Sequence, residues 1–314
     1  MHHRHHRPMA VAAGWLLAVA SIGSGCAGST PPPTGPPAWP GAVRVASFNF
    51  PESELVAEIY GQALIARGVP VRMELDLGTR ELVLPAFQQG LVDVVPEYMG
   101  SALQALEPEA TGNMADRSFV AGRLQAVLAR WHGTLLDPSP AQDQNGLVVT
   151  REAAAEYGLE TISDLRRVAA GMTFTAPPEC PERPYCLQGL ERVYGLRFRS
   201  QLPLATEGER VTALEQHVAD VALLFTTNPD VARHDLVLLR DDRHLEPAEN
   251  LAPVVSDRVR ELYGARLTQT LDAVSTRLSS EELMFLNWRV SVGGRSASEE
   301  AHGWLVRRGL AARS

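Results

Sequence analysis

The pattern of apolar and polar positions from residue 43 onward predicts alternating strands and helices. Residues 43–48 form a short apolar run typical of a strand. Residues 49–52 (Asn-Phe-Pro-Glu) then predict a helix start, because Asn can cap a helix and Pro and Glu suit its first turn. Residues 71–77 alternate apolar with charged side chains, which indicates a second strand. A helix is predicted over 79–89 and a strand over 92–95. This alternation of strands and helices implies a mostly parallel α/β sheet.

The same alternation of strands and helices recurs in the second half of the chain. A strand is predicted at 147–149, a helix at 152–157, and a capped helix start at 161–165. Residues 221–225 are a continuous apolar run, which suits a buried strand. From Val255 the pattern is helical almost to the end. Two α/β units with a helical C-terminus predict a two-lobed protein with a ligand cleft.

The N-terminus has the pattern of an export signal. Arg4 and Arg7 precede an apolar run of about 14 residues at 9–22, too short for a stable membrane span and typical of a signal peptide. The small residues at 23–25 and the lone Cys26 resemble a bacterial lipoprotein signal, in which the cysteine carries the lipid. The alternative is ordinary cleavage that leaves Cys26 unmodified. No later stretch is long and apolar enough to span a bilayer.

A linker rich in Pro, Gly, Ser and Thr follows the signal. Prolines recur between residues 31 and 40, which predicts a stiff, extended tether. We therefore assign residues 1–25 to a signal peptide and residues 26–42 to the tether. The expected location is the outer face of the cytoplasmic membrane, with attachment through a lipid on Cys26.

Composition and charge exclude several classes of function. The 314 residues include 45% hydrophobic and 21% charged residues and carry a formal net charge of -8, which fits a globular protein and argues against nucleic acid as a partner. The sequence contains no P-loop, no G-x-G-x-x-G, no H-E-x-x-H and no G-x-S-x-G motif. We expect no enzymatic activity, no cofactor and no metal, with an exported hydrolase as the remaining enzymatic alternative.

Two cysteines remain within the folded part, Cys180 and Cys186, with five residues between them. In an oxidising compartment they are expected to form a disulfide. A zinc site is the competing interpretation, but it needs about four ligands and no His or second Cys pair lies nearby in the sequence.

Several motifs, in order along the chain, resemble those of one transport family. The stretch 47–53 (SFNFPES) resembles the opening motif of the glycine betaine, carnitine and choline binding proteins of ABC transporters, the ProX/OpuAC-type osmoprotectant-binding lipoproteins. The stretch 93–101 (DVVPEYMGS) is similar to a second motif of that family. Further similar segments follow, at 161–165, 177–184, 189–195, 220–227 and 247–253.

The resemblance implies an α/β type II periplasmic-binding-protein fold. In this fold two lobes close on a small solute about a hinge of two strands, and the protein hands the solute to an ABC permease and its ATPase. By resemblance, one lobe comprises residues 43–140 plus 250–314 and the other comprises residues 141–249. Two alternatives remain open: a ligand-sensing domain, and a binding protein for another solute class such as sugars or aromatic acids.

The resemblance also implies which residues bind ligand. Tyr98 falls on one position of the family's aromatic box, where a ring attracts a quaternary ammonium. Ser101 matches a hydroxyl position, and Arg183 matches the arginine that binds a ligand carboxylate. Asp143 aligns with an aspartate near the cleft.

Other box positions depart from the family pattern. Asn145 occupies a position where family members commonly have a second box Tyr. Glu249 and Asn250 lie in the region where family members commonly have another box Tyr, later in the sequence. Residues 225–228 also lack a Tyr, so Phe48 and Phe225 are the candidates for additional rings. We therefore expect a more polar site, with modest affinity for glycine betaine or a preference for another solute.

Overall fold

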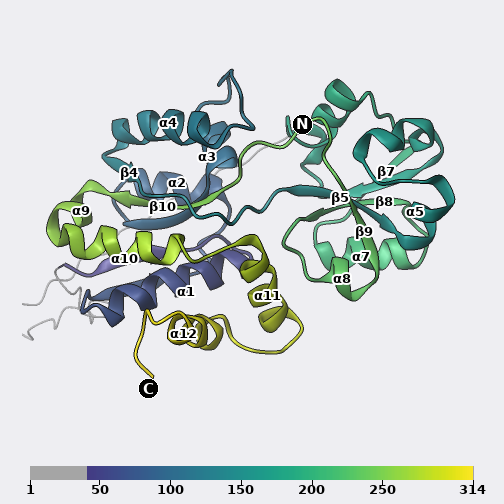
Figure 1. The fold of residues 1–314 in the computed structure, drawn as a ribbon. Helices are drawn as coiled ribbons and strands as arrows, with labels where there is room; N and C mark the ends of the chain where they lie inside the picture. The colour runs from purple at the N-terminus through teal and green to yellow at the C-terminus, as the bar shows by residue number, and fades with distance from the viewer. Residues whose placement is uncertain (1–40, 314) are drawn as a thin grey trace, which may run out of the picture. The chain divides into compact units, whose positions relative to one another are not determined.

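The computed structural model describes residues 41–313, which contain two five-stranded sheets. The first sheet has the order β2-β1-β3-β10-β4. Its strands β4 and β10 are labelled in Figure 1. β1 pairs in parallel with β2 and β3, whereas β10 runs antiparallel to β3 and β4. We call this sheet with its helices the first lobe. Its strands are β1 (Val43–Ala46), β2 (Val71–Glu74), β3 (Val94–Tyr98), β4 (Gly133–Leu135) and β10 (Leu251–Ser256).

Helices cover both faces of the first sheet. Neighbouring residues of a strand point to opposite faces, and the core divides accordingly. Val94 and Val255 pack in one cluster with α1 and α10, whereas Val95 and Val254 pack in another with α2, α3 and α4. The helices of this lobe are α1 (Pro51–Ala66), α2 (Arg80–Gln88), α3 (Met99–Leu106), α4 (Arg117–Leu128), α9 (Asp257–Tyr263), α10 (Ala265–Ser275), α11 (Ser280–Ser291) and α12 (Ala297–Arg307).

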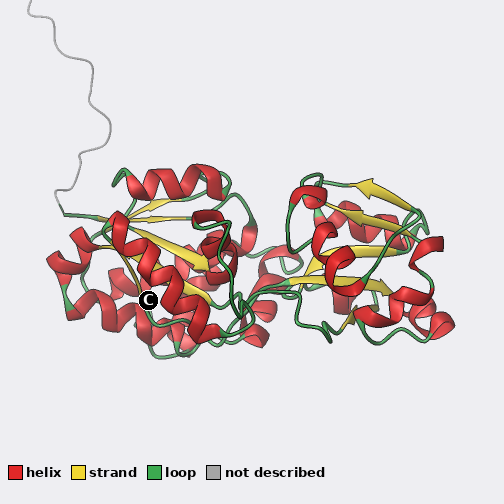
Figure 2. Cartoon of the chain, turned by 90° about the horizontal axis from the view of Figure 1, so that it is seen from above, coloured by secondary structure: helices red, strands yellow, loops and turns green. Residues whose placement is uncertain are grey.

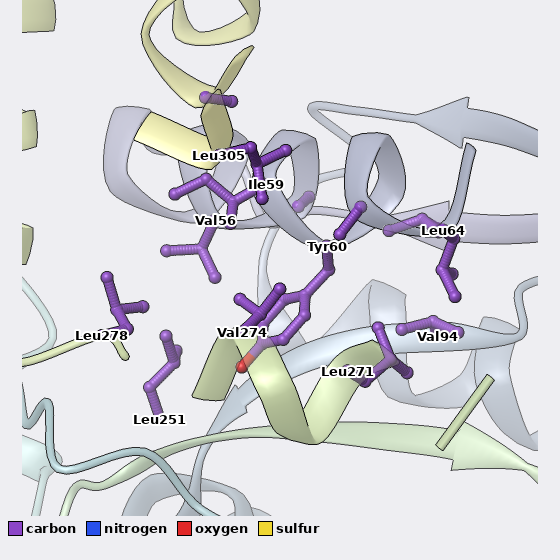
Figure 3. Close-up of a cluster of buried hydrophobic side chains, with 14 of the residues drawn as sticks. Val56, Ile59, Tyr60, Leu64, Val94, Leu251, Leu271, Val274, Leu278 and Leu305 are labelled. Carbon is purple, nitrogen blue, oxygen red and sulfur yellow. The ribbon is translucent and has the colours of Figure 1, made fainter. Parts of the chain in front are cut away.

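Helix α1 is the centre of the first lobe's larger core. Figure 3 shows Val56, Ile59, Tyr60 and Leu64 of this helix among side chains of β3, β10 and α10. The ring of Tyr60 is fully buried, and its hydroxyl lies 2.8 Å from Oγ of Ser275. α1 is therefore fixed from three sides, which gives the residues at its N-terminus a rigid support.

The second sheet has the order β7-β6-β8-β5-β9. We call this sheet with its helices the second lobe; Figure 2 draws the strands of both sheets in yellow and the helices in red. β6 pairs in parallel with β7 and β8, and β5 runs antiparallel to β8 and β9. Its strands are β5 (Asn145–Thr150), β6 (Thr173–Ala176), β7 (Ser200–Pro203), β8 (Val221–Phe225) and β9 (Leu236–Leu239). Its α-helices are α5 (Arg151–Tyr157), α6 (Leu187–Gly189), α7 (Glu207–Glu215) and α8 (Asp230–Arg233).

The sheets are mostly parallel, as predicted, with one reversed strand in each. β10 and β5 run against the other four strands of their sheets, because they enter from the opposite end after the chain has crossed from the other lobe. One prediction about local structure is wrong. Asn49 does not cap α1: the N-cap position is Phe50, and no described side chain caps the helix. Ser53 instead turns its Oγ back to accept a hydrogen bond from the backbone N–H of Phe48 at 2.8 Å.

Two segments, residues 136–144 and 240–250, connect the lobes. We call them the connecting segments. They pair with each other through an antiparallel bridge between Gln142 and Asn250. The N–H of Leu251 donates to the carbonyl of Ala141 at 3.0 Å, which continues the pairing. Side chains on the connecting segments therefore lie at the junction between the two lobes.

The disulfide between Cys180 and Cys186 is present, as predicted, with Cα atoms 5.3 Å apart. Within residues 41–313, no helix is long and apolar enough to cross a membrane. The signal peptide, the tether and Cys26 lie outside the described residues.

Candidate functional site

Glu52 connects the two lobes at the N-terminus of α1. It is 7% exposed and accepts a hydrogen bond on Oε1 from the hydroxyl of Tyr98, at 2.6 Å. Its Oε2 accepts one from Oγ1 of Thr227 at 2.6 Å and another from Nδ2 of Asn287. Tyr98 ends β3 and Asn287 lies on α11, whereas Thr227 follows β8 in the second lobe. One carboxylate thus gathers three neutral donors from distant parts of the chain.

Asp143 lies beside Glu52, on the first connecting segment. It is 8% exposed, and its Oδ1 accepts hydrogen bonds from the N–H of Thr227 at 3.1 Å and from Oγ1 of Thr226 at 3.4 Å. Both of these hydrogen bonds go to the same carboxylate oxygen, Oδ1. Burial raises the pKa of Asp143 well above its ordinary value, and repulsion from Glu52 adds to the rise. Burial likewise raises the pKa of Glu52, against its hydrogen bonds.

A cavity of about 190 Å³ adjoins this carboxylate pair. None of the described residues that line the cavity is basic. Glu207 of α7 also contributes to the wall, accepts a hydrogen bond from the N–H of Phe225 at 2.6 Å, and has its pKa raised by burial. The cavity is therefore acidic on several sides. Its main lining residues are Phe50, Glu52, Asp143, Glu207, Phe225 and Asn287.

Aromatic rings form a second feature of the site, with Phe50 at their centre. The ring centroid of Phe50 lies 6.0 Å from Phe48, 6.0 Å from Tyr98 and 6.5 Å from Phe225. The structure thus brings together three residues predicted from the sequence, Phe48, Tyr98 and Phe225. Phe50 is not among the predicted site residues, although it lies in the family motif at 47–53.

Arg80, at the start of α2, is a half-buried cation next to these rings. Its guanidinium carbon lies 5.0 Å from the centre of the Phe48 ring. Its Nε and Nη2 both donate to Oε2 of Glu97, at 3.2 and 3.1 Å, which neutralises the charge. The pair was not predicted, since seventeen positions separate the two residues in the sequence.

The positions where the family pattern has other tyrosines carry buried carboxylates or their donors. Ser101 donates to Glu249 twice, from Oγ at 2.5 Å and from its N–H at 3.0 Å. Nδ2 of Asn145 donates to Oε2 of Glu246 at 3.0 Å. Burial, followed by repulsion from Glu249, raises the pKa of Glu246 well above its ordinary value. Both glutamates lie on the second connecting segment.

Of the predicted site residues, Asp143 and Phe225 line the cavity. The others do not: Phe48, Tyr98, Ser101, Asn145, Arg183 and Asn250. The Arg183 side chain, inside the disulfide loop, is 57% exposed and lies 3.2 Å from Oε1 of Glu179. Asn250 is buried on the second connecting segment, where its Nδ2 donates to the carbonyl of Ser139 at 2.9 Å. Its Oδ1 is buried without a partner in the part of the chain that the structure describes.

The chemistry of the site favours a cationic group. Buried carboxylates are unfavourable unless they are paired or protonated, and aromatic faces attract cations. Across residues 41–313, no group of three or more His, Cys, Asp or Glu residues is placed to hold a metal ion. The arrangement therefore suits capture of a small organic cation, or of the cationic end of a larger solute.

Comparisons with known proteins agree with the motifs. A family model, OpuAC, described as the substrate binding domain of the ABC-type glycine betaine transport system, matches residues 41–307. The chain is 28% identical over 280 residues to the glycine betaine-binding protein YehZ of Escherichia coli K12, covering 85% of this chain and 90% of that protein. It is also 28% identical over 273 residues to the glycine-betaine-binding protein of Pseudomonas aeruginosa PAO1, covering 84% and 86%.

The fold is shared with solved structures. The crystal structure of a glycine betaine/carnitine/choline ABC transporter protein superposes with a TM-score of 0.75 at 22% identity, covering 85% of this chain and 99% of that chain. The two-lobed α/β fold and the family resemblance predicted from the sequence are both confirmed.

Proposed function

Because the chain belongs to the OpuAC family of ABC-transporter substrate-binding domains, we propose that it binds a small osmoprotectant outside the cytoplasm. The ligand class is a quaternary ammonium or a similar small polar solute, which the protein delivers to an ABC permease and its ATPase. Glycine betaine, named for the Escherichia coli and Pseudomonas aeruginosa relatives, supports this class.

One observation carries the proposal: the acidic, ring-lined cavity is built from both lobes. Phe50 and Glu52 come from the first lobe, Phe225 and Glu207 from the second, and Asp143 from a connecting segment. A ligand that contacts both lobes favours the arrangement in which both sets of contacts are made. Binding is thereby coupled to the relative position of the lobes, which is what a transport receptor needs.

Within this proposal, Tyr98 and Phe225 present rings to the ligand, and Asp143 contributes charge. Arg183 is the proposed partner for a ligand carboxylate, because it is exposed and its surface pair with Glu179 is easily exchanged. Ser101, Asn145 and Asn250 act by holding Glu249, Glu246 and the connecting segments in place.

Isothermal titration calorimetry against glycine betaine, choline, carnitine, a sugar and an aromatic acid tests the function. Saturable binding of a betaine or choline supports it. If only the sugar or the aromatic acid binds, the ligand belongs to that solute class instead of the osmoprotectants. If no small solute binds at all, the transport role is overturned.

We further propose that Cys26 carries a lipid and that residues 27–42 tether the folded domain to the outer face of the cytoplasmic membrane. The support is the sequence pattern of the first 42 residues. Mass spectrometry of the membrane fraction is expected to find a mature N-terminus at a diacylglyceryl-modified Cys26. A mature protein that begins at any other residue would rule the anchor out.

A further inference from the structure

We propose that a second cavity, between α1, α10 and the turn that follows α12, binds a small organic anion: a carboxylate with a short apolar chain. The site is separate from the proposed osmoprotectant site, and the inference does not rest on that function. It is carried by two arginines without acidic partners, which line the cavity together with apolar side chains.

The second cavity lies at the other end of α1 from the carboxylate pair of Glu52 and Asp143. Its volume is about 350 Å³. α1 and α10 pack side by side (Figure 1), and both contribute to the wall. Glu52 lies in the first turn of α1, and Arg67 is the C-terminal cap of this helix of 16 residues. A helix of that length measures about 24 Å, so the two sites do not share a wall.

Helical spacing explains why these residues face one another. On α10 the lining residues recur at intervals of three and four positions, which places them on one face of the helix. They are Arg266, Gln269, Thr270 and Ala273. On α1, Ala63 and Arg67 are one helical turn apart and share a face in the same way. Small side chains at positions 63 and 273 leave room between the helices, and Leu310, from the turn after α12, completes the lining.

The charge of the second cavity is entirely positive. Arg67 and Arg266 line it, and none of the described residues in its wall is acidic. Neither guanidinium has an ion pair or a hydrogen bond to another residue of the range 41–313. The chain as a whole carries a formal net charge of -8, so a wall with only positive charge differs from the surface around it. An anion between the two arginines would neutralise both.

The donors in the wall suit a carboxylate. A guanidinium binds a carboxylate through two parallel hydrogen bonds, and the cavity offers two such groups. The side-chain amide of Gln269 has no partner among the described residues and can supply a further N–H. The hydroxyl of Thr270 already donates to the carbonyl of Arg266, at 2.6 Å. The charged head of the ligand is therefore held by Arg67, Arg266 and Gln269.

The apolar part of the wall favours an organic anion over a bare inorganic ion. Ala63 is 1% exposed and Leu310 is 8% exposed, and Ala273 is half-buried beside them. A methylene group that moves from water onto such a surface tightens binding by up to about fourfold. A ligand with a short alkyl chain thus gains affinity that acetate or phosphate cannot gain.

NMR titrations of the full chain at constant ionic strength, with hexanoate, acetate and hexanamide, test the ligand class. Hexanoate is expected to bind saturably and about tenfold tighter than acetate, because its longer chain contacts the apolar wall. Hexanamide has the same chain without the charge, and it is expected to bind about tenfold more weakly than hexanoate. If acetate binds as tightly as hexanoate, the arginines attract an adventitious ion only and the inference is overturned. Equal binding of hexanamide, or no binding of hexanoate, overturns it as well.

Two variants test the location. Arg67→Gln combined with Arg266→Gln is expected to lower the affinity for hexanoate by about tenfold or more. Arg130→Gln is the matched control, since Arg130 is an exposed arginine of the first lobe that does not line the second cavity. Ala273→Leu keeps both arginines and fills the space between the helices, so it is expected to abolish binding of hexanoate.

Binding of hexanoate that survives both Ala273→Leu and the double arginine variant would overturn the inference. The comparison of the three ligands on the wild-type protein does not depend on whether a variant folds. Titration of the same variants with glycine betaine and choline reports on the proposed function separately, because that site lies at the opposite end of α1.

Discussion

The hydroxyl of Thr227 donates a hydrogen bond to Glu52 across 175 positions of sequence, at 2.6 Å. Thr227 follows β8, the central strand of the second sheet, and Glu52 lies in the first turn of α1. The same Thr227 gives its backbone N–H to Asp143. A single residue therefore holds two buried carboxylates close together.

Removal of this hydroxyl is expected to destabilise the protein. Thr227→Val keeps the side-chain volume but leaves Glu52 without one of its three donors, which costs about 1–3 kcal/mol of unfolding free energy. Urea denaturation followed by circular dichroism measures it. Thr227→Ser is expected to restore most of the loss, and Thr212→Val, at an exposed helical threonine, to have little effect. Equal losses at positions 212 and 227 would contradict the importance of the bond.

The buried state of Asp143 predicts an unusual dependence of stability on pH. Its pKa is raised in the folded protein, so the folded state holds the proton more tightly than the unfolded state. Below about pH 4, Asp143 is protonated in both the folded and the unfolded state. As the pH rises toward the folded pKa, the unfolded state loses this proton first, so the free energy of unfolding falls. Asp143→Asn is therefore expected to melt higher than the wild type at pH 7, with the difference shrinking toward pH 4.

Melting temperatures of both proteins at several pH values between 4 and 7 test this expectation. The comparison between the two proteins is needed because the carboxylates of Glu52 and Glu207 also lie in this region and have raised pKa values. A variant that is less stable than the wild type at pH 7, by the same amount as at pH 4, would show that Asp143 is not strained by its burial.

Arg183 is expected to discriminate ligands by their carboxylate. Arg183→Ala should weaken the binding of glycine betaine by about tenfold, because a charge-assisted hydrogen bond is lost. The affinity for choline should remain nearly unchanged. Calorimetry with both ligands measures the difference. Arg197→Ala serves as control, because this exposed arginine also pairs with a glutamate, Glu191, at 2.8 Å. If both ligands respond alike to Arg183→Ala, the carboxylate does not bind there.

The Tyr98 ring and the Tyr98 hydroxyl are expected to act separately. Tyr98→Leu removes the ring beside Phe50. It should lower the affinity for any cationic ligand by about 2- to 30-fold, the range of a cation–π contact. Tyr98→Phe keeps the ring and loses the bond to Glu52, so it should lower stability more than affinity. Affinities and melting temperatures of the two variants separate the roles. Identical affinities in both variants would argue against a ring contact.

Local patterns in the sequence predict most elements of this fold. The start of α1 at Pro51, the buried strand over 221–225 and the capping box at Thr161 are present as expected. The direction of β5 and β10 was not predictable in the same way. Apolar periodicity reports which face of a strand is buried, and it carries no information about which end of the sheet the chain enters.

The site shows the same limit. Glu52 fits a helix start, and that local explanation concealed its bonds to Thr227 and Asn287, which lie 175 and 235 positions away. Tyr98 and Phe225 are predicted from family motifs, and Phe50 lies in the motif at 47–53, whereas Arg80 and Glu207 lie in none. Their roles depend on contacts that form only when both lobes have folded and the connecting segments have paired.

The pairing of the connecting segments makes the second lobe, in topological terms, an insertion with adjoining ends. The N–H of Asp143 lies 3.4 Å from the carbonyl of Glu249, so the chain leaves and re-enters the first lobe at almost the same point. A short turn in place of residues 144–248 would join these ends with little displacement of β4 and β10.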